Sequence, residues 1–170
     1  MYDSLNKDIS LSIDGIGIVI YSKGMMSYVE EGTDFFSNDF AEPESVANHI
    51  RKGDITGFCT GTSGDFVLKI REGYPDAEID KQYPVGIRLA LEVKEHTVSF
   101  MDLAWLMEWN TDIPSEQQLN LDDGFYHLTV LTRKPDDGLW GSNQTIYIYF
   151  NRLDSMPALT WKGVPQLFTD

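Results

Sequence analysis

The sequence has few cysteines and no long apolar run. Its 170 residues include one cysteine, Cys59, so an internal disulfide and a structural zinc site built from several cysteines are both excluded. The most apolar run near the start spans residues 16–20, far short of the roughly 20 residues that cross a bilayer. The first residues show no basic segment followed by an apolar stretch, so no leader is expected. These features favour a cytoplasmic protein.

Positive charge is also scarce. The chain has 13 Lys+Arg against 27 Asp+Glu, a formal net charge of −14. Binding to the phosphate backbone of nucleic acids requires clustered Lys and Arg, and anionic membranes attract basic segments, so neither is an expected partner. A negative field attracts basic proteins and speeds their encounter. Acidity also keeps proteins soluble, so charge alone does not decide between these two roles.

Period-two alternation of apolar and polar residues predicts a β protein. Segments of this kind, rich in β-branched and aromatic residues, cover residues 9–13, 16–20, 65–70, 86–93, 96–100, 125–132 and 145–150, with a short last strand at 158–161. Turn residues separate them, and the length suits one domain over residues 1–170. We therefore expect an all-β fold, an antiparallel β-sandwich or open barrel.

Two short helices are expected within this β fold. Residues 43–52 begin with proline and acidic residues, end with Arg51 and Lys52, and precede Gly53, which is the order of helix start and stop signals. Residues 102–109 have apolar positions at helical spacing, with Asp102 as the predicted N-cap. The glycine-rich segment 57–64 lacks the Gly-Lys-Ser/Thr of a phosphate-binding loop and predicts a hairpin turn.

Residues for catalysis or metal binding do not form a recognisable set. His49, His96 and His127 lie in three different predicted elements, without metal-ligand spacing. Cys59 has no basic neighbour in sequence that would activate its thiol. We therefore predict no cofactor, no metal site and no catalytic residues, and we expect that the protein is not an enzyme.

The segment from Glu30 to Glu44 holds six carboxylates and no Lys or Arg, with phenylalanines between them. The rings either pin this segment to the sandwich or serve as anchors for a partner. Aromatic anchors surrounded by carboxylates suit a surface that meets a basic protein. The candidate partner-binding residues are Glu30, Glu31, Asp34, Phe35, Phe36, Asp39, Phe40 and Glu42, with Trp140 on a predicted hairpin tip.

Residues 85–135 carry a resemblance to known proteins. Ala90-Leu91-Glu92-Val93, a short turn and Thr97-Val98-Ser99-Phe100 are followed by residues 121–130, Leu-Asp-Asp-Gly-Phe-Tyr-His-Leu-Thr-Val. The pattern resembles small acidic inhibitors of the competence protein J type, which neutralise a secreted or DNA-entry nuclease. It is also similar to immunity proteins of bacterial polymorphic toxin systems. The matching positions are structural, so the resemblance transfers no binding residue to this chain.

The leading functional hypothesis is therefore inhibition by tight binding. An immunity protein or nuclease inhibitor would cover the active site of a basic toxin, with carboxylates in place of nucleic-acid phosphates. The alternative is a non-catalytic carbohydrate-binding or scaffolding β-sandwich, because aromatic faces stack on sugars. The residues that would serve this alternative are Trp109, Trp140, Tyr147, Tyr149 and Trp161. The oligomeric state remains open.

Overall fold

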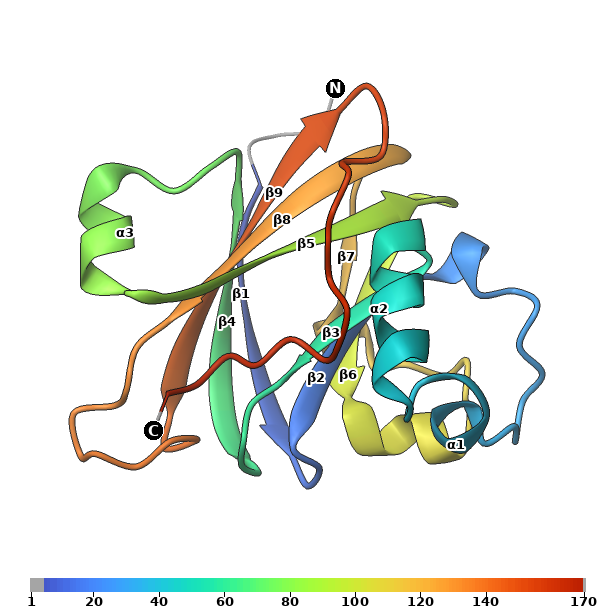
Figure 1. Ribbon diagram of the computed structural model, residues 1–170, viewed down its shortest axis with the longest axis horizontal. Helices are drawn as coiled ribbons and strands as arrows, with labels where there is room; N and C mark the ends of the chain where they lie inside the picture. The colour runs from blue at the N-terminus through green and yellow to red at the C-terminus, as the bar shows by residue number, and fades with distance from the viewer. Residues whose placement is uncertain (1–4, 170) are drawn as a thin grey trace.

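The computed structural model describes residues 5–169. Residues 1–4 and residue 170 lie outside the described residues, and residues 1–4 are the start of the segment in which no leader was expected. Two β-sheets form a sandwich (Figure 1). The first sheet contains, in spatial order, β1 (Asn6–Ile13), β4 (Gly64–Glu72), β9 (Gln144–Leu153), β8 (Gly124–Thr132) and β5 (Val85–Val93). The second contains β3 (Ile55–Cys59), β2 (Gly17–Ser22), β6 (Thr97–Asp102) and β7 (Gln118–Asn120). The predicted all-β sandwich is confirmed.

Strand pairing departs from the expected antiparallel pattern at one place. β4 and β9 run parallel, with Leu68 opposite Ile146, while the other paired strands are antiparallel. Alternation of apolar and polar residues indicates a strand but not the direction of its neighbours. The prediction of a wholly antiparallel sheet is therefore wrong for this pair.

The core lies between the two sheets, where Phe100 of β6 meets Phe150 of β9 edge to face, with 6.3 Å between ring centroids. β1 shows the predicted alternation, with Ile9, Leu11 and Ile13 buried between exposed or half-buried residues. Every residue of β2, by contrast, is buried, because both faces of this strand are covered. Ile16, predicted to lie inside, is 55% exposed.

Six short helical elements flank the sheets. They are η1 (Lys23–Met25), α1 (Phe35–Asp39), α2 (Pro43–Lys52), α3 (Ala77–Gln82), η2 (Leu103–Met107) and η3 (Ser115–Gln117), where η marks a 3₁₀ helix, all within residues 5–169. α2 has the predicted bounds and is capped by Gly53, whose φ of 81° suits glycine. Asp102 caps η2 as predicted, but the segment is a 3₁₀ helix and ends at Met107. α1 and α3 were not predicted.

Two further predictions are wrong. Segment 57–64 is not a hairpin, because β3 and β4 belong to different sheets and the turn crosses between them. Residues 158–161 are not a strand; they lie beside β5, where the Trp161 indole N–H donates to the Arg88 carbonyl at 2.7 Å. Within residues 5–169, no helix is long and apolar enough to cross a membrane.

Replacing Phe100 with alanine should test the packing between the sheets. Phe100 is fully buried, so Phe100→Ala leaves a cavity and should lower the free energy of unfolding by about 3–5 kcal/mol. Urea denaturation measures this loss. Leu139, which is 64% exposed, supplies the control, since Leu139→Ala should change stability by about 0.5 kcal/mol or less. Equal effects of the two substitutions would contradict the assignment of the core.

Candidate partner-binding surface

The acidic segment, residues 30–44, runs past one end of the second sheet and contains α1 (Figure 1). The side chains of Glu30, Glu31, Asp39 and Glu42 are exposed. Asp34 is half-exposed and caps α1, because its carboxylate accepts the Ser37 N–H at 2.9 Å. This hydrogen bonding lowers the pKa of Asp34 from its ordinary value. The segment therefore presents most of its carboxylates to solvent.

Its phenylalanines serve the fold more than the surface. Phe35 and Phe40 are 1% and 4% exposed, and Phe35 packs edge-on against Trp109 with 5.6 Å between ring centroids. Phe36 is half-buried. The interpretation that the rings pin the segment is thus correct for Phe35 and Phe40. Neither ring has appreciable exposed surface in this structure, and their selection as partner anchors, which the structure does not test, stays a prediction.

Backbone hydrogen bonds dock the acidic segment on the chain that follows η2. The Gly32 N–H donates to the Trp109 carbonyl, and the Trp109 N–H donates to the Thr33 carbonyl, each at 2.8 Å. The Thr111 hydroxyl also donates to the Glu31 carboxylate at 2.7 Å. These contacts join residues 31–33 of the acidic segment to residues 109–111, and the two stretches form one acidic surface.

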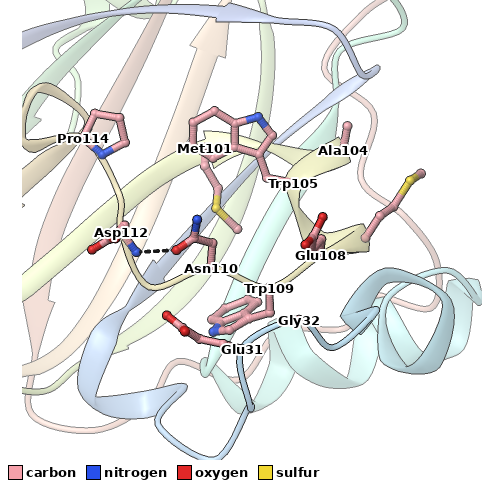
Figure 2. A pocket seen from close by; sticks show the side chains of 11 residues that line it. Glu31, Gly32, Met101, Ala104, Trp105, Glu108, Trp109, Asn110, Asp112 and Pro114 are labelled. Carbon is pink, nitrogen blue, oxygen red and sulfur yellow. Dashed lines mark hydrogen bonds between the residues drawn. The ribbon is translucent and has the colours of Figure 1, made fainter.

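A groove of about 760 Å³ lies at this junction (Figure 2). We call it the acidic groove; its lining residues are Glu31, Gly32, Met101, Ala104, Trp105, Met107, Glu108, Trp109, Asn110, Asp112 and Pro114. Three of them are carboxylates, and none is Lys, Arg or His. Trp105 and Met107 are 41% and 54% exposed, so the groove joins apolar surface to negative charge.

Trp105 and Met107 were not among the predicted surface residues. Residues 102–109, with apolar positions at helical spacing, were expected to form a helix. The 3₁₀ helix η2 has three residues per turn, which leaves Leu106 fully buried but turns Met107 outward. An exposed tryptophan next to an exposed methionine is typical of a contact surface.

The carboxylate of Asp102 holds η2 in place. It accepts hydrogen bonds from the backbone N–H groups of Asp14 at 2.8 Å, Gly15 at 3.2 Å and Ala104 at 2.9 Å. Asp102 is 3% exposed, and its hydrogen bonds join the β1–β2 turn to the first turn of η2. The orientation of Trp105 and Met107 therefore depends on a buried capping residue.

A second buried carboxylate, Asp54, anchors the chain that leads into the acidic segment. It accepts hydrogen bonds from the Ile55 N–H at 2.9 Å and the Tyr28 hydroxyl at 3.3 Å, and it pairs with His49 Nδ1 at 2.9 Å. Burial raises the pKa of Asp54, but the hydrogen bond from His49 and the charges of His49 and Lys52 outweigh burial, so that the pKa lies below its ordinary value. The His49 side chain is largely buried, at 16% exposed.

The remaining candidates lie elsewhere. Trp140 is half-buried in the loop that joins β8 to β9, a hairpin as predicted, and it does not line the acidic groove. His96 pairs with Asp123 at 3.4 Å, and His127 with the Tyr74 hydroxyl at 2.9 Å. Within residues 5–169, no three His, Cys, Asp or Glu side chains gather in a metal-binding group.

Of the five aromatic residues proposed for sugar binding, Tyr147 and Tyr149 stack on β9 with 5.9 Å between ring centroids. Trp109 is 2% exposed and Tyr149 is 9% exposed, so both rings are enclosed. Trp161 lies in the C-terminal segment, where its indole N–H donates to the Arg88 carbonyl. The acidic groove, by contrast, places an exposed tryptophan, Trp105, beside polar groups.

Comparison with known proteins places the fold. No protein-family model matches the chain, and no curated protein matches it in sequence. The structure is similar to that of ComJ from Bacillus subtilis, described as an inhibitor of the DNA degrading activity of NucA, with a TM-score of 0.50 and 18% identity over 90% of this chain and 99% of ComJ. It is also similar to the protein described as crocagin biosynthetic gene J, with a TM-score of 0.53 and 12% identity over 87% and 98% of the two chains. The expected resemblance to the competence protein J type is confirmed at the level of the fold.

Replacing Asp54 with asparagine should make stability less dependent on pH. A carboxyl whose pKa is lowered by folding stabilises the protein above its unfolded pKa, near 4, and loses that contribution as the pH falls through the folded value. Asp54→Asn should therefore lower the free energy of unfolding by about 1–3 kcal/mol at pH 7. The deficit should shrink below about pH 4, as measured by denaturation across pH. Asp39→Asn, at an exposed carboxylate, is the control, and a deficit that stays constant with pH would contradict the assignment.

Proposed function

We propose that this protein is a non-catalytic inhibitor that binds a basic nuclease or toxin through its acidic groove and covers the partner's active site. The observation that carries the proposal is the acidic groove itself, in which exposed Trp105 and Met107 adjoin the carboxylates of Glu31, Glu108 and Asp112. Interfaces of tight complexes have this composition, with apolar anchors at the centre and charges that steer the approach.

The mechanism follows from how nucleases hold their substrate. A nuclease meets the phosphate backbone with Lys and Arg side chains. The carboxylates of the acidic groove offer negative charge to those same side chains. Trp105 and Met107 bury apolar surface against the rim of the cleft, which slows dissociation. Binding then excludes nucleic acid by occupying the cleft, and no chemical step is required of the inhibitor.

The similarity in fold supports this reading from a separate direction. ComJ is described as an inhibitor of a DNA-degrading activity, and this chain shares its fold across 90% of its own length. A fold hosts many functions, so the inhibitor role here rests on the acidic groove, and the fold adds a precedent. The net charge of −14 also favours a basic partner, because opposite charges attract and speed the encounter.

A nuclease assay tests the proposal directly. The protein is titrated into DNA degradation by NucA and by any basic nuclease encoded beside this chain's gene. We expect this protein to inhibit at least one of these nucleases when added at about one equivalent. The Kd should be nanomolar, about −12 kcal/mol, and the affinity should weaken as salt is raised. Unimpeded degradation by both enzymes at micromolar inhibitor would contradict the proposal.

Charge reversal in and beside the groove should slow association. Glu30→Lys with Glu108→Lys removes steering charge, so we expect the association rate with the inhibited nuclease to fall about tenfold or more at low salt. Asp80→Lys with Asp154→Lys changes the net charge equally at exposed positions outside the groove and is the matched control. Stopped-flow kinetics measure both pairs, and equal rates for the two would remove the acidic groove from the mechanism.

Truncating the exposed tryptophan should act on dissociation instead. Trp105→Ala removes apolar contact surface and should cost about 2 kcal/mol of binding, or about a 30-fold faster dissociation. Trp105 is 41% exposed, so the variant should keep its unfolding midpoint. Leu139→Ala, also an exposed apolar truncation, is the control. If both variants dissociate as fast as the unmodified protein does, Trp105 is not an anchor.

A further inference from the structure

β5 is an outer strand of the five-stranded sheet, with β8 as its one sheet neighbour. The Glu92 N–H of β5 donates to the Gly53 carbonyl at 2.8 Å, away from β8. In an antiparallel pair, the backbone groups of alternate residues point to the same side. The N–H and C=O groups of Gly86 and Arg88 therefore point outward, to the free edge of the sheet.

The C-terminal segment runs beside this edge but does not pair with it. Figure 1 shows the chain crossing β5 after it leaves β9 and then continuing toward the C-terminus. The Trp161 indole N–H donates a hydrogen bond to the Arg88 carbonyl at 2.7 Å, so that carbonyl is already engaged. Within residues 5–169, no hydrogen bond engages the N–H of Gly86 or of Arg88. A strand edge left open in this way can pair with another chain.

Open space lies against these unpaired groups. A hollow of about 580 Å³ is lined by Gly86, Ile87, Arg88 and residues 158–162. A second hollow, of about 240 Å³, shares Gly86, Ile87 and Arg88 and is also lined by Asp80, Tyr83, Pro84 and Leu131. The start of β5 therefore has room alongside it for an extended chain.

The side chains around the larger hollow differ in character on the two sides of the sheet. Ile87 is half-buried and faces the core, where Leu159 and Trp161 also pack. Arg88 points to the outer face and is exposed, as is Lys162. No carboxylate lines the larger hollow. In a chain of net charge −14, the larger hollow is thus lined by two cations and no carboxylate, whereas Asp80 lines the smaller one.

We propose that the edge of β5 at Gly86–Arg88 binds an extended partner segment of alternating acidic and apolar residues as an added strand. The segment's backbone pairs with the outward N–H and C=O groups of Gly86 and with the Arg88 N–H. Its apolar side chains face Ile87, Leu159 and Trp161, and its acidic side chains face Arg88 and Lys162. This surface is separate from the acidic groove and does not depend on the inhibitor role.

Peptide binding followed by amide exchange tests the proposal. The probe is a short end-blocked peptide that alternates aspartate and valine, and the control alternates lysine and valine. The net charge of the protein favours the lysine peptide, so preference for the aspartate peptide has to arise locally. We expect about tenfold tighter binding of the aspartate peptide. By NMR, the Gly86 and Arg88 amides should exchange fast in the free protein and slowly in the complex.

Charge variants localise the site. Lys162→Glu and Arg88→Glu should each weaken aspartate-peptide binding about tenfold, whereas Lys23→Glu, at an exposed lysine on η1, should leave it unchanged beyond the net-charge effect. Arg88 also donates to Thr129 at 3.0 Å, so Lys162→Glu is the variant that keeps the fold.

Three results would overturn the proposal. One is equal or weaker binding of the aspartate peptide, and another is binding without protection of the Gly86 and Arg88 amides. The third is slow exchange of both amides before peptide is added, since residues 158–161 would then already occupy the edge. None of these results bears on nuclease inhibition through the acidic groove.

Discussion

The buried carboxylate of Asp102 is the contact on which the acidic groove depends. A carboxylate taken out of water is costly unless it is hydrogen-bonded, and here N–H groups from the β1–β2 turn and from η2 supply the partners. A side-chain carbon at Gly15 would lie 2.6 Å from the Asp102 oxygen, so the turn needs glycine for this approach. The end of η2 then positions Trp109, whose backbone binds the acidic segment. The acidic segment and the chain that follows η2 are thus held together by hydrogen bonds that begin at Asp102 and end at Trp109.

Local chemistry in the sequence predicted individual elements well. The proline, acid, base and glycine order marked α2 to the residue, and Asp102 was recognised as a cap. Alternation found most strands because a half-buried strand exposes every second residue. Burial of β2 on both faces and the parallel β4–β9 pair arise from contacts between distant segments, which a local pattern does not encode.

The candidate site was predicted in part for the same reason. The carboxylates of the acidic segment are exposed as expected, since charge alone keeps them in water. Phe35 and Phe40 turn inward because Trp109, far along the chain, offers them a packing partner. Trp105 and Met107 emerge because η2 is a 3₁₀ helix. Net charge was likewise a poor guide to the edge of β5, where Arg88 and Lys162 line a hollow that has no carboxylate.

The position of β9 has a consequence for synthesis of the chain. Among the described residues, β9 is the last strand in sequence, after eight others. It nevertheless lies at the centre of its sheet, between β4 and β8. A ribosome therefore releases β1, β4, β5 and β8 as two separate ribbons with unpaired inner edges. Only when residues 144–153 emerge can the ribbons join through one strand. Such contacts between distant segments slow folding and leave edges exposed to association, so a nascent chain of this protein passes through an interval in which a chaperone has open strands to bind.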